Sequence, residues 1–132
     1  MKWKLEPNIK EKSINAFLDL AILCRLMNKP MSGYAITSLL VKETGILVSP
    51  GMIYNTLYSM EINGLVKCIR KKPGRVYSLT EQGIEMAAAI PNKHKEIQAF
   101  LKILLYDNRA NLLKDNLKLY PSFPSSVKSK LS

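Results

Sequence analysis

Five cationic residues lie close together in the second half of the chain, and they are the side chains with the clearest chemistry. They fall within nine residues that contain no Asp or Glu, and they are Lys67, Arg70, Lys71, Lys72 and Arg75. Cations without neighbouring carboxylates suit contact with phosphate groups, which nucleic acids present in a regular array. A solvated turn can carry such residues too, but the absence of acids favours phosphate contact. The segment therefore predicts binding to a nucleic-acid backbone.

A polar stripe precedes these cations on a segment that predicts a helix. Ser49 caps its free N–H groups, Pro50 suits the first turn, and Gly64 ends it after Asn63. Short polar side chains can hydrogen-bond base edges without blocking entry into a major groove. The residues expected to contact DNA, on this helix and the following turn, are Ser49, Gly51, Met52, Asn55, Thr56, Ser59, Lys71, Lys72 and Arg75.

The sequence offers no pattern typical of an enzyme. His94, the only histidine, lies between two lysines, and no nucleophile–base pair or Gly-rich phosphate loop is found. Cys24 and Cys68 have no Cys or His at metal-ligand spacing, so both are expected to be small core residues. We expect no enzymatic activity, no metal and no cofactor. Tyr54, Tyr58 and Tyr77 are expected to pack at the edge of the core.

Composition agrees with a basic, compact protein. The chain has 132 residues, 47% of them apolar, and twenty Lys and Arg against ten Asp and Glu give a net charge of +10. This length suits one domain, and this charge suits an acidic partner such as nucleic acid. The densest apolar run, 16–27, is short and is interrupted by charges, and no targeting segment precedes it. We therefore expect no membrane association and a cytoplasmic location.

The elements that must position these residues follow from capping and periodicity. Ser13 is expected to cap a first helix that stops before Pro30, and Ser32 a second that ends at Gly45. Two β-rich segments flank the turn at 71–74 and predict a hairpin. The expected elements are helices at 13–29, 33–44, 50–63, 80–90 and 92–120, with strands at 65–70 and 76–79.

Three helices followed by a basic hairpin give the order of a winged helix-turn-helix. The predicted fold is mainly α with a small β-hairpin wing, plus a C-terminal dimerisation helix. We expect a leader at 1–12, a winged helix DNA-binding domain at 13–90, a dimerisation helix at 91–120 and a flexible tail at 121–132. Along the dimerisation helix one apolar stripe needs another surface to cover it. Its residues are Ile97, Phe100, Leu101, Leu104, Leu105 and Leu112.

Three segments resemble the PadR-like transcriptional regulators. They are 26–34 (LMNKPMSGY), 49–57 (SPGMIYNTL) and 74–83 (GRVYSLTEQG), and the similarity extends over about 16–90. Asn55 stands where the family often has Pro. The resemblance implies a cytoplasmic homodimer that represses transcription with two recognition helices in successive major grooves of double-stranded DNA. Some members bind phenolic or other flat apolar ligands near the interface, so a small aromatic effector is a candidate partner.

Two functions of different classes fit these observations. The first is a sequence-specific transcriptional regulator, a repressor that reads operator DNA with the third helix and holds the backbone or minor groove with the wing. The alternative is a nonspecific architectural protein that binds DNA or RNA through the same cations. The positive charge argues against a third reading, a protein-interaction adaptor that has lost nucleic-acid binding.

Overall fold

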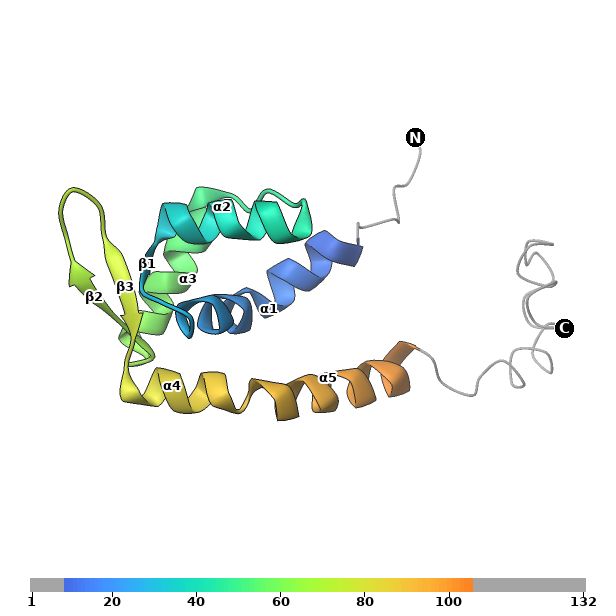
Figure 1. Ribbon diagram of the computed structural model, residues 1–132. Coiled ribbons are helices and arrows are strands. Elements are labelled where there is room, and N and C mark those ends of the chain that lie inside the picture. The colour runs from blue at the N-terminus through green and yellow to red at the C-terminus, as the bar shows by residue number, and fades with distance from the viewer. Residues whose placement is uncertain (1–8, 106–132) are drawn as a thin grey trace, which may run out of the picture. The chain divides into compact units, whose positions relative to one another are not determined.

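The computed structural model describes residues 9–105, which form a mainly helical protein with a small sheet, as the sequence predicts (Figure 1). The chain divides into two compact units, one ending at Ile90 and the other beginning at Pro91. Within 9–105, no helix is long and apolar enough to cross a membrane. The elements are α1 (Ile9–Leu26), β1 (Met31–Ser32), α2 (Gly33–Thr44), α3 (Pro50–Ile62), β2 (Val66–Arg70), β3 (Val76–Leu79), α4 (Glu81–Ala88) and α5 (Ile90–Leu105).

One hydrophobic core holds the first unit together. Each of the first three helices contributes apolar residues at helical spacing, and the sheet and α4 add further buried side chains. Burial of side chains of this size stabilises the fold by about 2 kcal/mol each before the entropy cost is counted. The side chains with almost no exposed surface are Ile22, Leu23, Ile36, Leu40, Ile53, Leu57 and Val66.

Three hydroxyl side chains cap helices at the positions that the sequence predicts. Ser32 accepts a hydrogen bond from the Ala35 N–H at 3.1 Å, and Ser49 accepts one from Met52 at 3.2 Å. The third is Thr80, whose Oγ1 accepts from the N–H of Gly83 at 3.0 Å. These caps fix where α2, α3 and α4 begin, because they satisfy N–H groups that have no partner within the helix.

The sheet has the strand order β1-β3-β2, all antiparallel, and β2 and β3 form the predicted wing. A bulge lies between Cys68 and Arg70 on β2. Strand β1 is absent from the sequence-based prediction; it pairs Met31 with Tyr77 and Ser32 with Val76. The inner strand of the wing is therefore held on both edges.

The first helix differs from the prediction in its start, in its straightness and in its end, which is Leu26 rather than residue 29. It begins by Ile9, so residues 9–12 are helical, and Ser13 lies inside it, donating a hydrogen bond to the Ile9 carbonyl at 2.7 Å. Backbone angles at Phe17 (φ −119°, ψ 24°) introduce a kink. The expectation that Cys24 is a core residue is wrong, because its side chain is exposed, whereas Cys68 is half-buried.

The C-terminal elements follow the prediction only in part. Helix α4 ends at Ala88, and α5 already begins at Ile90, so Pro91 lies in the first turn of α5, where its missing N–H is tolerated. Helix α5 is described to Leu105. The predicted continuation to residue 120 and the tail at 121–132 lie outside the described residues, as do residues 1–8 of the leader.

Candidate nucleic-acid interface

Helix α3 is fixed by its buried face. Ile53, Leu57 and Met60 are buried, and α3 packs against α1, α2 and β2. A close approach of backbone to aromatic ring secures the contact with α2, because a Cβ at Gly33 would lie 2.6 Å from Cε1 of Tyr54. Only glycine fits there without movement of the ring. The face of α3 opposite its core is thereby left at the surface.

The polar stripe predicted on α3 consists of Met52, Asn55, Thr56 and Ser59, and the structure brings these residues together on one side of the helix. Met52, Asn55 and Ser59 are exposed and Thr56 is half-buried. All four line an open groove of about 720 Å³, whose other wall includes Asp19 of α1. The Thr56 hydroxyl donates to the Met52 carbonyl at 2.7 Å, so its hydrogen is already used within the helix. The stripe therefore lies on the side of α3 nearest α1.

The residues that the sequence predicts to contact DNA do not include the larger exposed side chains of α3. Tyr58 is 62% exposed and Ile62 67%, whereas Tyr77, grouped with Tyr58 by the sequence analysis, is 3% exposed. Tyr54 is 46% exposed. The expectation that Tyr58 packs at the core edge is wrong. The angular positions of Tyr58 and Ile62 around the helix, counted from the centre of the buried face, place both residues on the outward side. The polarity of the side chains alone does not give this direction.

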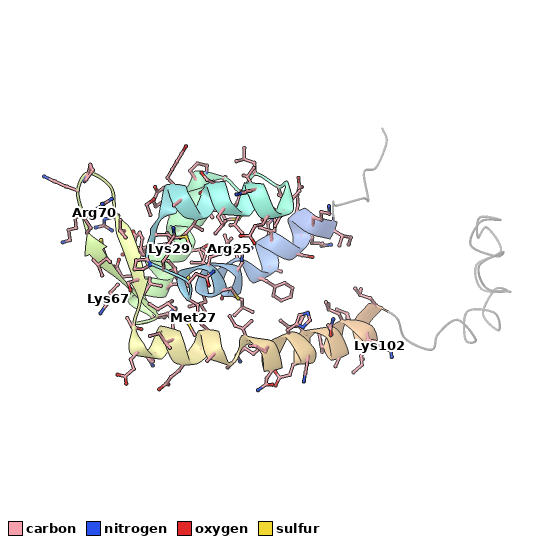
Figure 2. All side chains as sticks on the ribbon, in the orientation of Figure 1. Arg25, Met27, Lys29, Lys67, Arg70 and Lys102 are labelled. Carbon is pink, nitrogen blue, oxygen red and sulfur yellow. The ribbon has the colours of Figure 1, made fainter. Side chains whose placement is uncertain are left out.

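The wing presents the five cations away from carboxylate partners. Figure 2 shows Lys67 and Arg70 on the wing strand β2, and both are exposed. The remaining three, Lys71, Lys72 and Arg75, are exposed at the end of the hairpin and are called the wing-tip cations below. Among residues 9–105 the one salt bridge joins Arg25 to Glu43, at 3.4 Å, well outside the wing. The cations are thus available to an external anion.

Two hydrogen bonds orient the guanidinium groups of the wing. Arg70 Nε donates to the Gly74 carbonyl at 3.5 Å, which ties the strand to the turn. Arg75 donates to the Tyr77 hydroxyl at 3.5 Å, and this hydrogen bond raises the pKa of Arg75 above its ordinary value. Both are long bonds to neutral oxygens, so each guanidinium keeps N–H groups for phosphate.

The apolar residues predicted for a dimer interface fall on α5. Phe100, Leu101, Leu104 and Leu105 are exposed and Ile97 is half-buried, whereas Leu112 lies outside the described residues. No residue of α5 is buried. The role of this stripe in dimerisation stays a prediction. In the part of the chain that the structure describes, no group of three His, Cys, Asp or Glu side chains is placed to hold a metal ion.

Three helices with short connections and a basic two-stranded wing define a winged helix-turn-helix protein of the kind that regulates transcription by binding DNA. The sequence model of the Transcriptional regulator PadR-like family matches residues 22–89. The chain belongs to this family, as its motifs predict, and regulators of the family are generally not enzymes.

Solved structures share the fold. A transcriptional regulator from Clostridium thermocellum is 19% identical with a TM-score of 0.61, over 71% of this chain and 95% of that one. A PadR family regulator from Eggerthella lenta is 20% identical, with a TM-score of 0.60 over 74% and 89%. One from Clostridium difficile R20291 is 23% identical, with a TM-score of 0.56 over 67% and 98%. A comparison with curated proteins gave no match.

Proposed function

We infer that the protein is a sequence-specific repressor that binds operator DNA as a homodimer in the cytoplasm. Helix α3 enters the major groove, and the wing contacts the backbone or the minor groove. The observation that carries this proposal is the position of five cations without a carboxylate partner on the wing, which packs through β2 against α3. Membership of a family of transcriptional regulators also supports a DNA-binding regulatory function.

The wing and α3 are expected to contribute differently to DNA binding, because they differ in rigidity. The wing-tip cations are long side chains on an exposed turn, which suits contacts to phosphate that carry little sequence information. Asn55 stands on a helix held by a capped N-terminus and a buried face, and an amide can form two hydrogen bonds with adenine. The wing would therefore supply affinity, while α3 would supply specificity.

Homodimer formation is supported by the surface of α5. On this 16-residue helix Phe100, Leu104 and Leu105 are each at least 60% exposed. A continuous apolar face of this kind is typical of an interaction site, and coiled-coil packing of two such helices would cover it. A dimer would also place two copies of α3 on one operator, which a repressor reading two half-sites needs.

The test is a comparison of affinities at fixed salt. A random-sequence duplex pool is passed over the full chain, and the enriched duplex is measured against unselected DNA and against double-stranded RNA of equal length. A specific regulator should prefer the enriched DNA by about a thousandfold or more. Comparable affinities for all three would support the nonspecific architectural alternative and refute the proposal.

A further inference from the structure

The face of α3 that points directly away from the core differs from the polar stripe. At about 100° per residue, the line opposite the buried face runs through Gly51, Asn55, Tyr58 and Ile62, which we call the outer ridge. Every member is exposed. Tyr58 and Ile62 are also the most exposed large apolar side chains of α3. The outer ridge is therefore the part of α3 that can reach furthest into a groove.

The remaining members of the polar stripe, Met52, Thr56 and Ser59, are less well placed to contact bases. These three residues line the groove shared with α1, as do Gly51 and Asn55 of the outer ridge, and Asp19 lies on the α1 side of it. A carboxylate there repels phosphate, which favours approach of DNA to the side of α3 that carries Tyr58 and Ile62, since neither of these residues lines the groove. Asn55 is the one residue that belongs to both the stripe and the outer ridge. The side facing the bases is thus expected to include Tyr58 and Ile62.

The chemistry of the outer ridge limits what it can recognise. In the major groove of B-DNA the C5-methyl of thymine is the apolar group that distinguishes one base pair from another. We propose that Tyr58 and Ile62 contact thymine methyl groups beside an adenine paired with Asn55, so that the operator half-site contains an A followed by T-bearing base pairs. This proposal rests on the proposed function, since it assumes that α3 lies in the major groove.

The dimensions of the helix set the length of the site. Asn55 and Ile62 are seven residues apart, about 10.5 Å along the helix axis. At about 3.4 Å per base pair, the outer ridge covers about three base-pair steps. Tyr58 lies between them, on the turn after Asn55. Each of the two apolar side chains therefore has its own base pair, and their contributions are separable.

The experiment removes single methyl groups from the DNA. The full chain selects a duplex from the random pool, and each thymine in it is then replaced by deoxyuridine, which lacks only the methyl. Wild-type protein should bind about fourfold more weakly for each contacted methyl that is lost. Tyr58→Ala and Ile62→Ala should each lose affinity for the thymine duplex and become insensitive to deoxyuridine at one position. Both positions are exposed on a helix, where alanine is the best helix former, so the variants should fold.

Tyr34→Ala is the matched control, because it removes a tyrosine that is 78% exposed on α2 rather than on α3, and it should keep full sensitivity to deoxyuridine. A selected duplex on which no deoxyuridine weakens binding would overturn the thymine contacts while leaving the proposed function intact. Unchanged sensitivity in both Tyr58→Ala and Ile62→Ala would do the same. A pool that yields no enriched duplex would overturn the proposed function, and the thymine contacts with it.

Discussion

Replacing Gly83 by alanine tests how closely α4 packs against the start of the wing. A Cβ at this position would lie 2.0 Å from the Leu65 carbonyl oxygen, whereas carbon and oxygen normally approach to about 3.3 Å. The backbone must therefore separate by about 1.3 Å. The same oxygen accepts the Thr80 N–H at 3.0 Å, and the Thr80 hydroxyl donates to the Gly64 carbonyl at 2.5 Å. We expect both bonds to be lost on such a displacement.

The expected cost combines strain with these losses. Overpacking costs about 1–3 kcal/mol and each lost hydrogen bond about 1 kcal/mol, while alanine in place of glycine in a helix returns about 1 kcal/mol. We expect the free energy of unfolding to fall by about 2–4 kcal/mol and Tm to fall by about 10–20 °C in a domain of this size. Thermal unfolding followed by circular dichroism, at fixed protein concentration, measures the change.

Gly51→Ala is the control for Gly83→Ala. Gly51 also lies in a helix, but a Cβ there meets no atom within 4 Å, so Tm should equal or exceed that of the wild type. If Gly83→Ala unfolded within a few degrees of the wild type, the close contact between α4 and Leu65 would not limit stability. The assignment of Gly83 to a packing role would then be refuted.

Three further predictions concern binding and assembly. Replacing the wing-tip cations by alanine should weaken binding to selected and random DNA equally, and should lower the slope of log affinity against log salt concentration by about one per lost phosphate contact. Lys12→Ala is the control and should leave affinity and slope unchanged. An unchanged slope in the wing-tip variant would show that these cations do not contact phosphate. Asn55→Ala should cost about 1–3 kcal/mol on the selected duplex and leave random DNA unaffected, and an equal loss on both would remove it from base reading. Leu101→Glu with Leu104→Glu should yield monomers in sedimentation velocity, whereas Gln98→Glu should remain dimeric; a stable dimer of the double variant would exclude the α5 stripe as the interface.

Local signals predict the wing and the starts of α2, α3 and α4. Ser32, Ser49 and Thr80 act through hydrogen bonds to residues three positions later, and Gly45 ends α2 with φ 74°. Interactions of this range are contained in a few neighbouring residues, so the sequence reveals them. Strand β1 is different. Its two residues are extended because β3 offers them a free edge, and that edge is contributed by residues far along the chain.

The wrong expectations for Cys24 on α1 and for Tyr58 on α3 have a common physical origin. Cys24 follows Ile22 by two positions, about 200° around the helix, and therefore lies away from the buried side. On α3, the type of Tyr58 predicts packing at the core edge, but the direction of the outer face depends on how Ile53 and Leu57 dock against α1 and α2. Residue type alone does not give that direction. The basic wing was predictable because its charge is concentrated within a few residues.

The two-residue strand β1 has a consequence for the engineering of DNA-binding proteins. Its pairing with Val76 and Tyr77, together with the bond from Thr80 to Gly64, holds the paired strands of the wing from their base up to the last pair before the turn. Residues 71–73 and Arg75 are exposed and lie beyond the last β2–β3 pair, Arg70 with Val76. Insertions are tolerated best where exposed backbone makes few hydrogen bonds. Loops of other lengths and charges can therefore be grafted between Arg70 and Val76, which makes this hairpin a replaceable module on an unchanged scaffold.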